Sequence, residues 1–206
     1  MSATETSTAA AGPMPGLRER KKVKTRQNIR RAAYRLFAEQ GYPATTVERI
    51  AEAADVSPST FFRYFPTKED VVIHDEYEAM LVAALGGRPS DEPVVDAIRH
   101  TLTESLARLL ETDRDELLFR MRLGFTVPAV RARCSDERQR SQDAIAAVIV
   151  ERTGRAADDL AAHCAAAAII AVFTAVLRHW VERGGVQDVV GLCDGQLALF
   201  ACGLRL

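Results

Sequence analysis

Hydrophobic residues recur at helical spacing along nearly the whole chain. Ile29, Ala33 and Phe37 form an apolar stripe on a helix that we expect over about residues 24–40, ending at Gly41. No stretch keeps the alternation of apolar and polar residues that is typical of a half-buried strand. The pattern therefore predicts an all-α protein.

Two short helices separated by a tight turn follow this first helix. The first begins at Thr45, where Thr45 and Glu48 form a capping-box pattern that can satisfy free backbone amides. Asp55 lies in the turn, and aspartate is one of the few residues besides glycine that tolerate left-handed backbone geometry. Ser57 and Pro58 then supply an N-cap and a proline at the first helical position.

Residue size at the crossing of these two helices suits close packing. Ala51 is small where the helices approach each other, and Val56 and Phe61 can fill the space between them. A second helix held in this way can enter a major groove with its N-terminal residues toward the base edges. The segment therefore predicts a helix-turn-helix, although an ordinary helical hairpin shares the pattern.

The remainder of the chain is predicted to be helical as well. We expect a tail without fixed structure at 1–17, a helix-turn-helix domain at 18–68 and a larger α-helical domain at 69–206. Loops with Gly or Pro separate the further helices expected at about 67–85, 92–110, 115–124, 136–152, 157–183 and 186–204.

Charge is unevenly distributed, although the formal net charge is only -1. Nine Lys and Arg residues lie between Arg18 and Arg35 against Glu19 alone, whereas acidic residues outnumber basic ones beyond residue 70. A basic block beside an acidic remainder indicates a polyanion-binding end, with a solvated basic tail as the alternative.

The cysteines and the apolar segments favour a cytoplasmic protein. Residues 161–177 are apolar but short and rich in alanine, so we interpret them as a buried helix rather than a membrane span. The first residues lack the apolar segment of a signal peptide. We expect free thiols, without metal-like spacing, at Cys134, Cys164, Cys193 and Cys202.

The sequence contains none of the common active-site motifs. G-x-S-x-G, H-E-x-x-H and glycine-rich phosphate loops are all missing. His74 and Glu78 have a spacing that could hold a metal ion, but such a pair more often lies on a solvated helix surface. We therefore expect no enzyme activity, no metal site and no cofactor.

Residues between about 25 and 72 follow a motif, defined by residue types at fixed spacings. Its members are Arg26, Ala32, Ala33, Leu36, Phe37, Gly41, Tyr42, Thr45, Thr46, Val47, Ile50, Ala51, Ala54, Asp55, Val56, Ser57, Thr60, Phe61, Tyr64, Phe65, Pro66, Lys68 and Glu69. This set, which covers roughly a quarter of the chain, resembles the N-terminal domain of TetR-family transcriptional regulators.

The resemblance implies DNA contacts at the starts of three helices. Thr46 matches a phosphate-contacting threonine and Lys68 a phosphate-clamping lysine, and helix N-termini favour anions at both places. Residues of the third helix match positions that contact bases and backbone. The expected DNA-binding set is Arg26, Thr46, Ser57, Pro58, Ser59, Thr60, Phe62, Arg63, Tyr64 and Lys68.

Some positions depart from the family pattern. Pro58 and Ser59 stand where members often have Lys-Gly, and Phe62 stands where tyrosine is common. Arg63 could compensate as a phosphate anchor or a guanine contact. We also expect residues 18–24 to form an arm before the first helix that contacts the minor groove or backbone, with a solubilising tail as the alternative.

The resemblance implies that the last two helices form a dimer interface. The helices expected at 157–183 and 186–204 are apolar nearly all round, and a monomeric core would leave a large apolar patch exposed. A homodimer through these helices would present two recognition helices to a palindromic operator.

The resemblance also implies an effector pocket in the larger, ligand-binding and dimerisation domain. We expect a small hydrophobic or amphipathic effector, of which fatty acyl-CoA and drug-like molecules are two examples in the family. Arg120, Arg122, Arg131 and Arg133 could attract an anion, although a solvated face is the simpler interpretation. Candidate lining residues, each of which could instead be plain core, are Tyr77, Met80, His100, Phe119, Met121, Phe125, Phe173 and Trp180.

Together these observations predict a ligand-responsive transcriptional regulator. We expect a cytoplasmic repressor that binds palindromic operator DNA as a homodimer and is released by a small-molecule effector. The alternative is a DNA-binding protein without a small-molecule ligand, regulated by a protein partner or by its abundance.

Overall fold

A computed structural model describes residues 16–73 and 76–203 of the chain. The tail expected at 1–17 lies almost wholly outside this part. The chain divides into two compact units, which end and begin at Val71 and Val72. Every regular element among the described residues is a helix, so the predicted all-α fold is confirmed.

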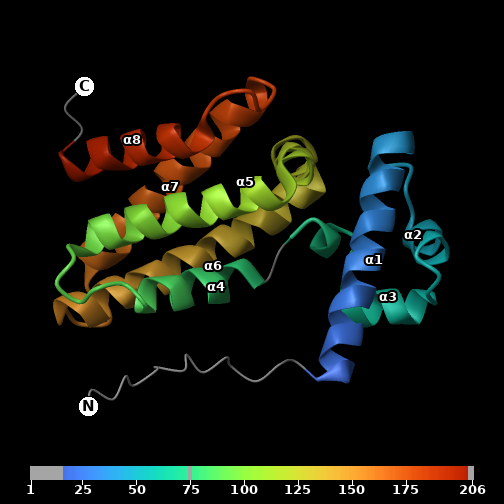
Figure 1. The fold of residues 1–206 in the computed structure, drawn as a ribbon, viewed down its shortest axis with the longest axis horizontal. Coiled ribbons are helices and arrows are strands. Elements are labelled where there is room, and N and C mark those ends of the chain that lie inside the picture. Colours follow the sequence, from blue (N-terminus) through green and yellow to red (C-terminus); the bar gives the residue numbers. More distant parts are fainter. Residues whose placement is uncertain (1–15, 74–75, 204–206) are drawn as a thin grey trace, which may run out of the picture. The chain divides into compact units, whose positions relative to one another are not determined.

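The first unit contains three α-helices and a short 3-10 helix (Figure 1). These elements are α1 (Leu17–Gln40), α2 (Val47–Ala53), α3 (Pro58–Tyr64) and η1 (Glu69–Val71). Their shared core contains Ile29, Phe37, Ile50, Phe61 and Phe65, all nearly or fully buried. Burial of each such side chain stabilises the fold by about 1.5–3 kcal/mol.

The turn between α2 and α3 has the predicted geometry. Asp55 has a φ of 54°, in the left-handed region, and Ala51 is fully buried at the helix crossing. The Val56 amide donates to the Ala51 carbonyl at 2.9 Å and closes the turn. The helix-turn-helix expected from the sequence is therefore present.

The start of α2 corrects one expectation. Thr46, not Thr45, is the N-cap, and its side chain accepts a hydrogen bond from the Arg49 amide at 3.3 Å. Thr45 is fully buried, and its hydroxyl donates to the Gly41 carbonyl at 2.9 Å. The expected capping box at Thr45 and Glu48 is wrong by one residue because the Thr45 hydroxyl is already used in the core.

Two further expectations about helix boundaries are wrong. Residues 18–24 are not an arm before the first helix, because α1 begins at Leu17. This stretch is rich in Lys and Arg, which are good helix formers. The helix expected at 67–85 is broken, because the Asp70 carboxylate accepts hydrogen bonds from the Thr67 amide and hydroxyl and closes a short turn there.

The second unit is a bundle of five helices, in which α5 and α8 lie side by side (Figure 1). The apolar faces of all five helices meet in one core that includes the fully buried Leu102, Ile169 and Trp180. The helices are α4 (Glu76–Gly86), α5 (Val94–Thr126), α6 (Pro128–Thr153), α7 (Leu160–Glu182) and α8 (Val189–Ala201).

The helix boundaries of this bundle agree with the sequence at one place and differ at another. The segments expected at 92–110 and 115–124 lie in one element, α5, but the expected break between them is present at Asp113, which has a non-helical φ of -161° and ψ of 75°. The Asp113 carboxylate accepts a hydrogen bond from the Glu116 amide and so caps the second half. The helix expected from 136 begins already at Pro128, since proline suits a first helical position.

By length and mean hydropathy (2.3), α7 alone among the described helices could cross a membrane. In the structure it contributes Ala166, Ile169 and Trp180 to the core of the second unit. Only a third of its apolar stretch is buried inside the chain, however. The outward side of this helix carries small residues such as Ala171 and Ala175 in its middle, and polar residues such as Arg178 and Glu182 toward its C-terminus.

Candidate DNA-binding surface and effector cavity

Three hydroxyl groups gather at the N-terminus of α3. Ser57 is the N-cap, and its Oγ accepts a hydrogen bond from the Thr60 amide at 3.1 Å. The same Oγ lies 2.9 Å from Ser59 Oγ and donates to Thr60 Oγ1 at 3.0 Å. Ser57 and Ser59 are exposed, so the start of α3 offers groups that can donate to and accept from DNA.

The two sides of α3 are clearly different. Phe61 is fully buried, with its ring centroid 5.8 Å from that of the buried Phe65. Phe62 and Arg63 are exposed on the other side, and the Arg63 guanidinium lies 5.4 Å from the centroid of the half-buried Tyr64 ring. The core therefore fixes the orientation of α3, and an aromatic and a cationic side chain remain available to a partner.

Lys68 is held in place by the protein. Its Nζ donates to the carbonyls of Tyr42 and Thr45 at 3.0 Å each and lies 4.1 Å from the Tyr42 ring centroid. These contacts fix the chain just before the N-cap Thr46, which is exposed. Lys68 therefore places a positive charge at the start of α2 and also stabilises the path of the backbone there.

Tyr42 extends this arrangement to η1. Its hydroxyl donates to Glu69 Oε1 at 2.7 Å. Burial and the neighbouring Glu69 carboxylate raise the pKa of Tyr42 far above its ordinary value. The phenol therefore stays neutral and continues to donate this hydrogen bond.

Some basic residues of α1 are held within the fold, and others are exposed to solvent. The half-buried Arg26 has its guanidinium carbon 5.1 Å from the Phe65 ring centroid. The buried Arg30 donates through Nε to the Val71 carbonyl at 3.1 Å. Arg18, Arg20 and the lysines between residues 21 and 24 are exposed along the first turns of the helix.

The ten predicted DNA-binding residues all belong to the first unit. Lys68 and Arg26 are partly engaged within the fold, whereas the hydroxyls at the start of α3 are open to solvent. The exposed members are Thr46, Ser57, Pro58, Ser59, Phe62 and Arg63, and the half-buried members are Arg26, Thr60, Tyr64 and Lys68.

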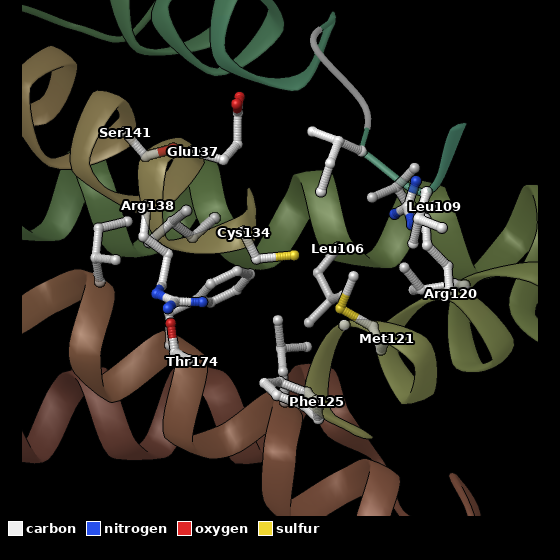
Figure 2. Close-up of a pocket in the computed structure, with 18 of the residues that line it drawn as sticks. Leu106, Leu109, Arg120, Met121, Phe125, Cys134, Glu137, Arg138, Ser141 and Thr174 are labelled. Atoms are coloured by element: carbon white, nitrogen blue, oxygen red, sulfur yellow. The ribbon is translucent and has the colours of Figure 1, made fainter. Parts of the chain in front are cut away.

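The second unit contains a cavity of about 190 Å³ (Figure 2). Its lining comes from residues 72–73 and from α4, α5, α6 and α7. Most of the lining side chains are apolar. They include Leu81, Leu102, Leu106, Leu109, Leu117, Met121, Phe125, Ile170, Phe173 and Leu177.

Three of the predicted ligand-binding residues, Met121, Phe125 and Phe173, line this cavity. Trp180 belongs to the core instead, where its indole Nε1 donates to the Gln187 carbonyl at 3.1 Å. Phe119 is half-buried outside the cavity lining. Aromatic character on these helices therefore identifies the lining only in part.

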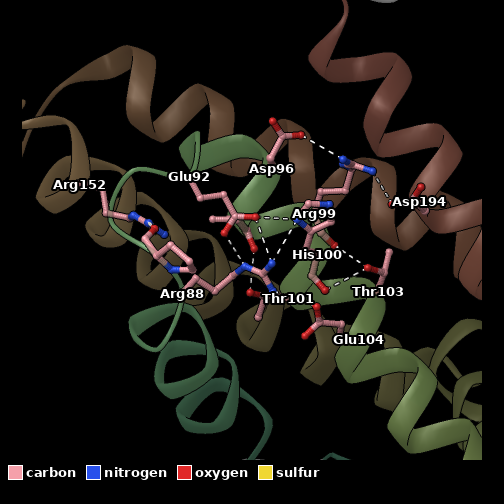
Figure 3. Close-up of polar contacts among 12 residues, drawn as sticks. Arg88, Glu92, Asp96, Arg99, His100, Thr101, Thr103, Glu104, Arg152 and Asp194 are labelled. Carbon is pink, nitrogen blue, oxygen red and sulfur yellow. Dashed lines mark hydrogen bonds and ion pairs between the residues drawn. The ribbon is translucent and has the colours of Figure 1, made fainter.

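Met80 is 46% exposed and His100 belongs to a polar network, so neither lines the cavity. The side chain of Tyr77 lies outside the described residues. In the network, His100 Nδ1 lies 2.7 Å from Glu92 Oε1, and Arg88 Nε donates to Glu92 at 2.6 Å (Figure 3). The loop between α4 and α5 is thus tied to α5.

Polar groups interrupt the apolar lining at a few points. Arg120 and Arg138 lie on opposite sides of the lining residues, with Cys134 and Leu106 between them (Figure 2). Burial raises the pKa of the Cys134 thiol, and the positive charges of Arg138 and Arg120 act against that rise. The thiol is therefore kept neutral in a field that is locally positive.

The arginines expected on a solvated face do not share one environment. Arg120 is buried and lines the cavity, whereas Arg122 and Arg131 are exposed. The half-buried Arg133 lies 3.4 Å from Asp136. Arg138 was not predicted from the sequence, although its helical spacing of four residues from Cys134 would have placed both on one face of α6.

Two family models match the chain. Residues 29–74 match the model described as bacterial regulatory proteins of the tetR family, and residues 92–205 match the MftR C-terminal domain. The HTH-type transcriptional regulator TcmR of Streptomyces glaucescens is 34% identical over 192 residues, which cover 87% of this chain and 84% of TcmR. The putative mycofactocin biosynthesis transcriptional regulator MftR of Mycobacterium tuberculosis is 26% identical, covering 84% and 92% of the two chains.

Solved structures agree with these matches. FadR of Thermus thermophilus, a transcriptional repressor solved with lauroyl-CoA, has a TM-score of 0.57 and 28% identity, covering 88% of this chain and 95% of FadR. FadR of Bacillus halodurans has a TM-score of 0.63 at 23% identity, covering 88% and 96%, and shows the shared fold. The chain belongs to the TetR family of bacterial transcriptional regulators.

Proposed function

We propose that this protein is a homodimeric transcriptional repressor that a small-molecule effector releases from palindromic operator DNA. The observation that supports this most directly is a mainly apolar cavity in a chain whose other unit is a helix-turn-helix. A repressor in the same family was solved with an acyl-CoA bound. The cavity also favours this function over a regulator controlled only by a protein partner or by abundance.

In this proposal the N-terminus of α3 contacts base edges and its outer face contacts phosphates. Ser57, Ser59 and Thr60 offer hydroxyls, and Arg63 offers a guanidinium that can bind guanine or phosphate. Thr46 and Lys68 bring a helix N-terminus and a positive charge to a neighbouring phosphate. Pro58, Phe62, Tyr64 and Arg26 complete the proposed contact set.

We propose that residues 18–24 contribute a sequence-independent contact to the DNA backbone. These residues are helical, and their exposed Arg and Lys side chains are placed for electrostatic contact. Replacement of Lys21, Lys22 and Lys24 by Gln should then make operator affinity less dependent on salt. The log–log slope should fall by about 0.9 for each phosphate that the variant no longer neutralises. An unchanged slope would show that this stretch does not touch DNA.

Dimerisation would use the outward faces of α7 and α8. Cys164, Ala168, Ala171 and Ala175 recur at spacings of three and four residues along α7 and are exposed or half-buried. Small side chains allow two helices to approach closely, and the apolar character of this face favours its burial against a second copy. A two-fold dimer would present two α3 helices to successive major grooves, about 34–36 Å apart.

Effector binding would act through the chain segment that follows the first unit. Val72 and Ile73 line the cavity. They directly follow Val71, whose carbonyl accepts hydrogen bonds from Arg30 Nε at 3.1 Å and from the Tyr34 hydroxyl at 3.2 Å. An effector in the cavity would stabilise a different position of residues 72–73. In a dimer this shift would change the distance between the two α3 helices, so that they no longer fit the operator.

The proposed function requires neither a catalytic group nor a metal ion. Within the described part of the chain, no group of three or more His, Cys, Asp or Glu side chains could hold a metal. A protein that regulates transcription meets its DNA in the bacterial cytoplasm, which is where we place it.

A mobility-shift assay with promoter DNA from the protein's own chromosomal neighbourhood tests the DNA-binding part. The wild type should shift one promoter fragment specifically, and Ser59→Ala with Arg63→Ala should abolish that shift. Both residues are exposed, so the double variant should remain folded by circular dichroism. A control variant, Thr112→Ala, changes an exposed hydroxyl in the second unit and should bind normally. Binding that ignores DNA sequence and survives the double variant would contradict the proposal.

A further inference from the structure

Arg120 is a charged side chain in a largely apolar environment. It lies on α5, is 7% exposed and lines the cavity of the second unit. Its Nε is buried and has no hydrogen-bond partner among the described residues. A buried guanidinium nitrogen without a hydrogen-bond partner is costly, and a fold normally satisfies such a group with a carboxylate or another acceptor.

The other charged groups of the lining are already engaged. Arg138 donates through Nη2 to Ser135 Oγ at 2.7 Å. Glu137 Oε2 lies 3.0 Å from Arg140 Nη1, which makes an ion pair rather than a hydrogen bond with a cation of its own helix. Arg120 is therefore the charged residue of the lining that is best placed to bind a ligand, because its buried Nε can still donate a hydrogen bond.

The rest of the lining limits what such a partner can be. Leu106, Met121, Phe125 and Phe173 require an apolar body. The space of about 190 Å³ is somewhat larger than the 150 Å³ apolar cavity that accepts benzene, so it suits a small ring system or a medium-length chain. A molecule with several charges would leave some of them unpaired against these side chains.

We propose that the effector is a hydrophobic monocarboxylate whose acid group pairs with the Arg120 guanidinium inside the cavity. The fork of guanidinium donors matches the two oxygens of a carboxylate, and the apolar body of the ligand covers the pair from water. This inference rests on the proposed role of the cavity as the effector site. It adds the chemical class of the effector and the residue that selects it.

Isothermal titration with three acid–amide pairs tests the ligand class: octanoate, decanoate and 1-naphthoate, each against its neutral amide. The wild type should bind at least one acid about tenfold or more tightly than the matching amide. Arg120→Met should remove this preference. Arg122→Met, which changes an exposed arginine two residues away on α5, should keep it. Equal binding of acid and amide, or no binding of any acid, would overturn the proposal.

A second measurement needs no ligand. Because Met fills a similar space without a charge, Arg120→Met should raise the melting temperature of the free protein, and Arg122→Met should leave it nearly unchanged. A lower melting temperature for Arg120→Met would show that the guanidinium is already satisfied, and the proposal would be wrong.

Operator binding separates this inference from the proposed function. An acid that binds through Arg120 without weakening operator binding would contradict the effector role and retain the ligand class. A neutral compound that releases the operator from both the wild type and Arg120→Met would retain the effector role and overturn the ligand class.

Discussion

Lys68 shows how one side chain can serve both the fold and a binding surface. Its ammonium group satisfies two backbone carbonyls and lies against the Tyr42 ring, immediately before the exposed N-cap of α2. Sequence resemblance assigned Lys68 to phosphate binding only. The structure adds a positioning role, since the same contacts fix the segment that presents Thr46.

Lys68→Ala should therefore destabilise the first unit as well as weaken DNA binding. Two carbonyls in part-buried hydrogen bonds would lose a charged donor, and hydrogen bonds to charged groups contribute about 1.5–3 kcal/mol each. Urea unfolding should show a loss between about 1.5 kcal/mol, the lower value for one such hydrogen bond, and about 6 kcal/mol, the upper value for two. The control is Lys24→Ala, which changes an exposed lysine on α1 and should cost well under 1 kcal/mol. Equal stability of the two variants would show that Lys68 has no structural role.

Residues that act through local backbone geometry could be predicted from the sequence, and buried charges could not. Asp55 was expected in a left-handed turn and Ser57 at an N-cap, because both roles depend on neighbours in the chain. Arg138 was not expected in the cavity, and Arg120 could not be told apart from three other arginines that could attract an anion, because burial depends on helices that are distant in sequence. For the same reason Trp180 was proposed as a cavity residue although it lies in the core.

At the scale of helices and loops, the sequence located most elements but not their ends. The helix expected from residue 24 begins at Leu17 and the helix expected from 136 begins at Pro128, whereas the break expected at 111–114 is present at Asp113. Helix ends depend on weak local competition between caps, as at Asp113. The apolar periodicity that indicates a helix is much stronger, so the long helices were expected in the right places, whereas the element type was wrong at residues 18–24 and 69–71.

The turn between α7 and α8 requires two adjacent residues with positive φ. Gly184 and Gly185 have φ values of 72° and 75°. A Cβ at Gly184 would meet open space, whereas a Cβ at Gly185 would lie 2.7 Å from Leu118 Cδ2. Gly184→Ala should therefore cost about 1–2 kcal/mol from backbone strain alone. Gly185→Ala should cost about 1–3 kcal/mol more, because Leu118 must move. Thermal unfolding of both variants would measure the difference, and equal losses would contradict this explanation.

The loop between α4 and α5 should make stability depend on pH. Hydrogen bonds from Arg88 and then His100 lower the pKa of Glu92 to about 2, from 4.5. A carboxyl whose pKa is lower in the folded state than in the unfolded state stabilises the fold at any pH above its unfolded-state pKa. This stabilisation is lost as the pH falls through the pKa of the folded state. The stability difference between the wild type and Glu92→Gln should therefore be constant above about pH 5 and shrink toward pH 2. A difference that does not change over this range would show that the network is not ionic in solution.

At the scale of the whole molecule, the proposed function requires two copies of the chain. The second unit alone leaves much of α7 uncovered, including Ala171 and Ala175. In a family whose members regulate transcription, such a face beside an apolar cavity agrees with the proposed dimer, in which effector binding is coupled to the spacing of two recognition helices.

Ala171→Glu should convert the proposed dimer to a monomer without unfolding it. The position is exposed in the single chain, but in the dimer it would bury a charge against a second copy. Sedimentation velocity should show one chain mass for this variant and two for the wild type. Ala147→Glu, at an exposed position on α6, should remain a dimer. If Ala171→Glu stays dimeric, the interface lies elsewhere.

Transcription in vitro from the promoter that the protein binds tests the central claim most directly. Purified wild-type protein should reduce transcript from that promoter, and Ser59→Ala with Arg63→Ala should not. Addition of a carboxylate that binds in the cavity should restore transcript with the wild type and fail to do so with Arg120→Met. An increase in transcript with the wild type, or repression that no cavity ligand relieves, would contradict an effector-released repressor.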